Sequence, residues 1–146
     1  MKKTSFVPAF IITRNNTKDY EGNLPCSVLF SDISGFTNMT EKLMKHKKRG
    51  AEKLSVVLEG LYDGIINIIS QNGGFVTGFA GDAVTALFTC DTICAVKAAF
   101  EIKVFVEHFS SEFTLSVKTG LSAGTMKYHI LDSKRRMYYF EGIPLN

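Results

Sequence analysis

The feature that most constrains the fold is a short apolar run at residues 27–33 that stops at polar and small residues. A run of this kind, bounded by serine and glycine, is typical of a central strand covered on both faces. Asp32 lies near its end. The turn that follows is expected to lead into a helix from Ser34 to about His46, capped by Ser34 or Thr37. The pattern therefore places a carboxylate where a buried strand meets the start of a helix.

The remaining periodicities predict further elements in a definite order. Apolar residues at three- and four-residue steps predict a long helix at 51–71, and a second is expected at 91–109. Between them, the turn at 80–83 predicts a hairpin in which Gly81 adopts a positive φ. Short strands are expected at 75–79, 84–89, 114–124, 126–131 and 137–140. This order indicates an α+β sandwich with helices packed on a mainly antiparallel sheet.

Composition fits one soluble globular domain. The chain has 146 residues, of which 45% are hydrophobic and 21% charged, and its net charge of +3 suits polyanionic ligands. No segment approaches the roughly 20 apolar residues that span a bilayer. Three cysteines are too few for a secreted disulfide framework, so a cytoplasmic location is expected. Cys90 and Cys94 are interpreted as plain buried thiols rather than as a metal or redox pair.

A basic cluster, KHKKRG, occupies residues 45–50 between the first two predicted helices. Binding of phosphate or of nucleic acid is one interpretation. A solvated loop between two helices is favoured instead, because no aromatic residues are interleaved with the charges. No nucleic-acid partner is therefore expected.

Asp32 and Asp82 form a candidate metal pair. Taken singly, Asp32 is better explained as a helix N-cap and Asp82 as a turn former. Taken together with their flanking residues, they favour a metal site. Mg²⁺ takes one or two carboxylates and fills its other positions with phosphate oxygens and water. Two carboxylates beside the start of a helix, where phosphate binds readily, therefore indicate nucleotide chemistry.

Three motifs resemble those of class III nucleotide cyclase catalytic domains: FSDISGFT at 30–37, the glycine pair at 73–74 and FAGDA at 79–83, with KTGLSAG at 118–124 in support. The closest likeness is to the first cyclase domain of soluble, bicarbonate-responsive adenylyl cyclases. The resemblance implies a ferredoxin-like sandwich. It also implies an N-terminal extension over residues 1–26 and a cyclase domain over 27–146 that is truncated at its C-terminus.

The resemblance also implies roles for individual residues. Two Mg²⁺ or Mn²⁺ ions would be held by Asp32, Asp82 and the backbone carbonyl of Ile33, the triphosphate of ATP by backbone N–H groups of Ser34, Gly35, Phe36 and Thr37, and the transition state by Asn146. The products would be cyclic AMP and pyrophosphate. The family's base-reading lysine and aspartate fall at Gly78 and Tyr139, so both adenine determinants are missing. The lysine of the bicarbonate site also falls at Gly78.

These departures leave two functional hypotheses. In pseudo-heterodimers of this family one domain supplies the aspartates, and the other supplies lysine, asparagine and arginine. The chain resembles the metal-donating half, active only when paired with a second cyclase domain in a homodimer or pseudo-heterodimer, with no membrane insertion by this segment. The alternative is a degenerate, non-catalytic domain that binds nucleotide or a partner domain for regulation. Diguanylate cyclases are not favoured, because Phe75 follows Gly74 where their acidic signature would stand.

Overall fold

The computed structural model describes residues 7–45, 47–110, 112–132 and 137–142. Its elements are, in chain order, α1 (Ala9–Asn16), β1 (Glu21–Ser34), α2 (Phe36–Met44), α3 (Lys47–Gln71), β2 (Gly74–Ala80), β3 (Ala83–Phe88), α4 (Thr92–His108), β4 (Ser116–Asp132) and β5 (Met137–Glu141). No helix of these residues is long and apolar enough to cross a membrane.

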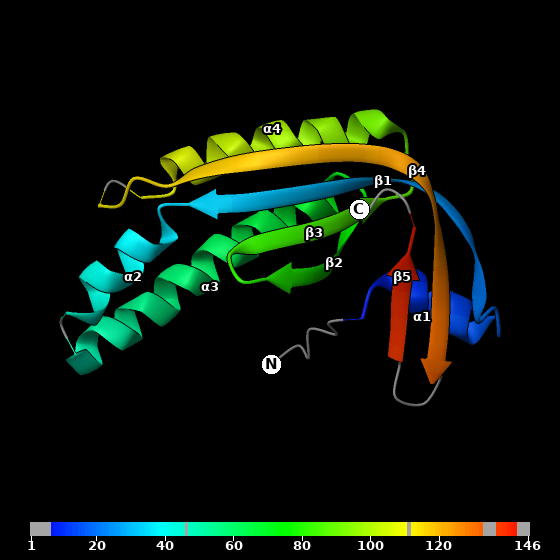
Figure 1. Cartoon of the computed structure of the whole chain (residues 1–146), viewed down its shortest axis with the longest axis horizontal. Coiled ribbons are helices and arrows are strands. Elements are labelled where there is room, and N and C mark those ends of the chain that lie inside the picture. The colour runs from blue at the N-terminus through cyan, green and yellow to red at the C-terminus, as the bar shows by residue number, and fades with distance from the viewer. Residues whose placement is uncertain (1–6, 46, 111, 133–136, 143–146) are drawn as a thin grey trace.

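The five strands form one antiparallel sheet in the order β2-β3-β1-β4-β5. β1 pairs with β4 along its whole length, from Glu21 to Ser34, and with β3 over its second half. Figure 1 shows that β1 and β4 bend. As a result, the first half of β1, the second half of β4 and β5 lie away from α3 and α4 and beside α1. The predicted α+β fold with helices on a mainly antiparallel sheet is confirmed.

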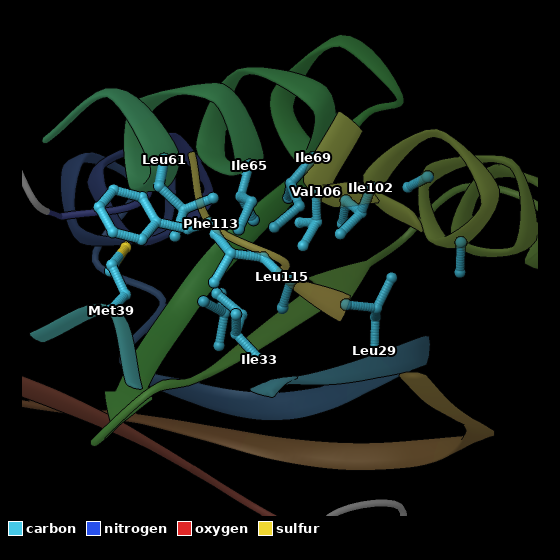
Figure 2. Close-up of a cluster of buried hydrophobic side chains, with 14 of the residues drawn as sticks. Leu29, Ile33, Met39, Leu61, Ile65, Ile69, Ile102, Val106, Phe113 and Leu115 are labelled. Carbon is cyan, nitrogen blue, oxygen red and sulfur yellow. The ribbon is translucent and has the colours of Figure 1, made fainter. Parts of the chain in front are cut away.

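One face of the sheet is covered by α3 and α4. Their apolar side chains at helical spacing pack on the strands and on α2 in a continuous core, which Figure 2 shows in close-up. The fully buried members include Leu29, Ile33, Met39, Leu61, Ile65, Ile69, Ile102 and Val106. This core sets the positions of β1 and β3 relative to α2.

The opposite face carries a second, smaller cluster. Val28 alternates with Leu29 along β1 and therefore projects from the other side of the sheet. Phe10 of α1 packs there, with its ring centroid 5.9 Å from that of Phe75 and 5.2 Å from that of Tyr128. α1 thus covers one end of this face, and no other described helix covers the rest of it.

The structure differs from the sequence predictions at several boundaries. β1 begins at Glu21, inside the segment interpreted as an extension, and β4 is one strand where two were expected, because it pairs with β1 without a break. Residues 47–50 form the first turn of α3 and are not a loop. The corner between α2 and α3 is tight, because Gly50 lies so close to the carbonyl oxygen of Leu43 that there is no room for a Cβ.

The cysteines are also placed differently from expectation. Cys26 is buried, but Cys90 is exposed and Cys94 half-buried, so the prediction of two buried thiols is wrong. Cys90 lies between the end of β3 and Asp91, the residue that caps α4. A residue at such a junction is outside the packed face of the helix, which explains its exposure.

Candidate nucleotide and metal site

Strand register brings the two candidate aspartates together. Asp32 is the last β1 residue paired with β3, and its partner is Ala83, which directly follows Asp82. Directly opposed Cα atoms of antiparallel strands lie about 4.5 to 5.5 Å apart, and successive Cα atoms about 3.8 Å apart. The Cα atoms of Asp32 and Asp82 are therefore within about 9 Å of each other, although the residues are distant in the sequence.

Asp82 occupies a two-residue hairpin turn. Ala80 pairs with Ala83, which leaves Gly81 and Asp82 as the turn. Gly81 has a φ of 64°, as predicted, and glycine adopts this left-handed conformation without strain. The turn is short, so the position of Asp82 follows directly from the β2–β3 pairing.

The hairpin turn is held against α3 by an aromatic contact. Tyr62 of α3 packs edge-on against Phe79, with ring centroids 5.4 Å apart. Burial, followed by the negative charge of Asp82, raises the pKa of the Tyr62 phenol. The Asp82 carboxylate therefore acts electrostatically on Tyr62, which lies in the second half of α3.

The start of α2 follows β1 without an intervening loop. Gly35 is its N-cap, with a φ of 94°, and an added Cβ would lie 2.5 Å from the carbonyl oxygen of Thr114. The expectation that Ser34 or Thr37 caps this helix is wrong, because Gly35 is the N-cap and no side chain of the described residues makes a capping hydrogen bond to α2. Met39 donates its N–H to the Gly35 carbonyl at 3.1 Å. The N–H groups before it lack intrahelical acceptors.

The other predicted site residues surround this corner, with one exception. Ile33 lies one residue past the β1–β3 ladder, and its side chain is buried in the core. Ser34 is half-buried, Phe36 packs partly against the core, and Thr37 is exposed. Asn146 lies outside the described residues.

Lys118 is a candidate site residue that was not predicted from the sequence. It is the β4 partner of Asp32, so both side chains project from the same face of the sheet. Because Asp32 alternates with the core residue Ile33, this is the face turned away from α3 and α4. Lys118 is exposed. The signal in the sequence was the KTGLSAG motif, but the pairing with Asp32 depends on strand register.

None of the described residues covers the sheet beside Asp32. Phe30, two residues earlier on the same face, is 46% exposed. It pairs with Thr85 on one side and Gly120 on the other, and Thr85 pairs in turn with Gly78. A Cβ at Gly78 or Gly120 would meet no atom of the described residues within 4 Å. The row of paired residues Gly78, Thr85, Phe30 and Gly120 is therefore accessible, and Gly78 contributes no side chain to it.

Tyr139 is engaged within the β4–β5 pair. Its ring stacks on the His129 ring, with centroids 4.6 Å apart. His129 is in turn hydrogen-bonded to Glu141, whose Oε1 lies 3.2 Å from Nε2 of His129. The residue at this position is thus an aromatic packing group, not a hydrogen-bonding carboxylate.

The donor set of the aspartate pair can be compared with the needs of metal ions. Among the residues described, no group of three or more His, Cys, Asp or Glu side chains is arranged to hold a metal. Two carboxylates alone do not suit Zn²⁺, which prefers three or four protein ligands, or Ca²⁺, which takes six to eight oxygens. They fit Mg²⁺ bound together with phosphate and water.

The fold is shared with solved cyclase structures. A bacterial light-regulated adenylyl cyclase matches with a TM-score of 0.74 and 25% identity, over 94% of this chain and 43% of that chain. The guanylyl cyclase Cya2 matches with a TM-score of 0.69 and 22% identity, over 86% of this chain and 68% of that chain. No family model matches the sequence.

The chain belongs to the class III nucleotide cyclase domain family, as its fold and its sequence relatives show together. In sequence it is similar to adenylate cyclase type 10 of Mus musculus, with 32% identity over 137 residues and 86% of this chain covered. The chain spans 8% of the length of that relative.

Proposed function

We propose that this domain contributes the metal-holding half of a site that converts ATP to cyclic AMP and pyrophosphate when it pairs with a second cyclase domain. The observation that carries the proposal is the pairing of Asp32 with Ala83, which sets Asp82 beside it. The names of the relatives support ATP as substrate, and the expected cytoplasmic location stays a prediction.

Different residues of the proposed site would bind the metal ions and the triphosphate. Asp32, Asp82 and the Ile33 carbonyl would hold two Mg²⁺ or Mn²⁺ ions. When bound, the metal lowers the pKa of the ribose 3′-hydroxyl and neutralises charge on the leaving pyrophosphate. The free N–H groups at the start of α2, over Ser34 to Thr37, and the Lys118 ammonium would bind phosphate oxygens and orient the triphosphate.

The chemical step is an intramolecular displacement at the α-phosphorus. The ribose 3′-oxygen forms a bond to this phosphorus, and the bond from the phosphorus to the bridging oxygen of pyrophosphate breaks. The 3′-hydroxyl proton is lost to water. Charge stabilisation by Lys118 and the helix start favours departure of the pyrophosphate, because negative charge grows there in the transition state.

A second candidate function is a non-catalytic domain that binds nucleotide or a partner for regulation. The observation that favours it is the state of the two base-reading positions. Gly78 has no side chain, and Tyr139 is stacked on His129. A partner domain that supplies the base-reading residues and the catalytic asparagine would make these positions unimportant, so the choice depends on whether any partner restores turnover.

The test is to mix the chain with a complementary cyclase domain that carries the base-reading lysine, the asparagine and the arginine. Cyclic AMP and cyclic GMP are measured with Mg²⁺ and with Mn²⁺. We expect cyclic AMP formation that falls by about 100-fold or more in Asp32→Asn and Asp82→Asn, and by about tenfold in Lys118→Gln. Glu59→Gln, which removes an exposed α3 carboxylate, is the matched control and should leave the rate unchanged.

Two results would count against catalysis. If Asp32→Asn retains the full rate, the aspartate pair is not the metal site. If no complementary domain yields cyclic nucleotide while ATP binding persists, the regulatory function is the correct one.

A further inference from the structure

The corner between α2 and α3 carries a basic hollow that the proposed cyclase chemistry does not use. It has a volume of about 600 Å³ and is lined by Lys42, Leu43, Lys45, Arg49, Gly50, Lys53, Glu112 and Phe113. It lies at the C-terminal end of α2, whereas the candidate nucleotide site lies at the N-terminal end. Since α2 has nine residues and rises about 1.5 Å per residue, the two ends are on the order of 10 Å apart.

Four cationic side chains reach the basic hollow from two helices. Lys42 lies in the last turn of α2 and Lys45 is its C-cap, while Arg49 and Lys53 are one turn apart on α3. Like charges at these spacings share a helix face and destabilise it. The fold brings both faces to the same hollow, which adds to the repulsion.

The positive charge is only partly offset. Glu112 is the one carboxylate among the residues that line the basic hollow, and its oxygens accept hydrogen bonds from Lys53 Nζ at 2.7 and 3.0 Å. Lys42, Lys45 and Arg49 form no ion pair within the described part of the chain. Three cations therefore converge without an ion-pair partner among the described residues.

We propose that the basic hollow binds a compact phosphate-bearing polyanion, of which inorganic pyrophosphate is a simple member. Its volume falls within the range usual for small-ligand sites. Arg49 offers the planar fork that pairs with phosphate oxygens in a bidentate way, and the lysines add point charges around it. A concave site with its cations on two adjacent helices suits a compact anion better than an extended acidic peptide.

The experiment is a calorimetric titration of inorganic pyrophosphate into the full chain at low ionic strength and without divalent metal. The double variant Lys45→Gln/Arg49→Gln should raise the Kd by about tenfold or more. Glu112→Gln should lower it, because Lys53 is released from its carboxylate partner. Two controls on α4 should leave the Kd unchanged: Lys97→Gln/Lys103→Gln, which removes two positive charges as the double variant does, and Glu107→Gln, which removes one negative charge as Glu112→Gln does. Binding should weaken as salt is added.

Several outcomes would overturn the proposal. One is the absence of pyrophosphate binding. Another is a Kd that the double variant leaves unchanged but Lys118→Gln raises, which would place the anion at the candidate nucleotide site. A third is binding of a polyglutamate peptide, sensitive to the double variant, without binding of pyrophosphate. Equal tightening by Glu112→Gln and Glu107→Gln would show a general effect of net charge only.

Discussion

Replacement of Gly35 by alanine should be unusually costly for a single methyl group. Its φ of 94° is left-handed, which costs an L-residue about 1 to 2 kcal/mol. The added Cβ would also lie 2.5 Å from the Thr114 carbonyl oxygen, and overpacking of this kind costs about 1 to 3 kcal/mol. We therefore expect the free energy of unfolding to fall by about 2 to 5 kcal/mol, and Tm by about 5 to 15 °C.

Two other glycines separate these contributions. Gly81 has a positive φ of 64° but open space around its Cβ position, so Gly81→Ala should cost about 1 to 2 kcal/mol. Gly120 has open space and no positive φ, so Gly120→Ala should be neutral or stabilising by about 0.5 kcal/mol. The assay is urea unfolding followed by far-ultraviolet circular dichroism, with the three variants compared at equal m-value.

The expected order of destabilisation is Gly35→Ala, then Gly81→Ala, then Gly120→Ala. Equal stability of Gly35→Ala and Gly120→Ala would refute the reasoning altogether. Equal losses for Gly35→Ala and Gly81→Ala would show that the approach to Thr114 carries no cost, and only the backbone conformation matters.

Three further predictions concern the core and two titrating groups. Ile65→Ala removes a fully buried side chain and should lower the free energy of unfolding by about 2 to 5 kcal/mol in urea; a loss below about 1 kcal/mol would contradict the packed core. Partial desolvation, then hydrogen bonding with Cys94, raises the pKa of the Cys90 thiol to about 11, so alkylation by iodoacetamide should stay slow at pH 8 although the residue is exposed. Cys94→Ser should shift that rate profile to lower pH, and an unchanged profile would count against the thiol contact. Burial, then a hydrogen bond with Asp19, raises the pKa of the Tyr128 phenol. The neutral phenol therefore makes its full contribution to the free energy of unfolding below pH about 10, the ordinary pKa of tyrosine, and this contribution is lost as pH rises through the folded-state pKa. Asp19→Asn should lower this pKa in an ultraviolet titration of the phenol, whereas no change would exclude the hydrogen bond.

The elements that could be predicted are those with a strong local signal. The stripe of α3 and the hairpin turn at Gly81 depend on residues that are neighbours in the sequence, and both were predicted correctly. The first turn of α3 was not predicted, because its basic residues are typical of a solvated loop. The close packing of Gly50 against the Leu43 backbone is not visible in the sequence. The unbroken course of β4 depends on its long pairing with β1, which is not local.

The candidate site shows the same division. Asp32 and Asp82 were selected from their flanking residues, but only the β1–β3 register shows that they are neighbours. Lys118 was overlooked because its relation to Asp32 is a cross-strand pairing. The N-cap was assigned to Ser34 or Thr37 on propensity, whereas the contact of Gly35 with Thr114 decides the residue at that position.

Asp32 pairs with both Ala83 and Lys118, so the direction of its side chain depends on the register of the sheet. Side chains alternate along a strand, so sliding β1 by a single residue would turn Asp32 into the interior and bring Ile33 out to water. No small slippage lies between these arrangements. Mutations that loosen the ladder should therefore abolish the proposed metal site of Asp32 and Asp82 in an all-or-none manner, as a switch between discrete populations and not as a gradual decline.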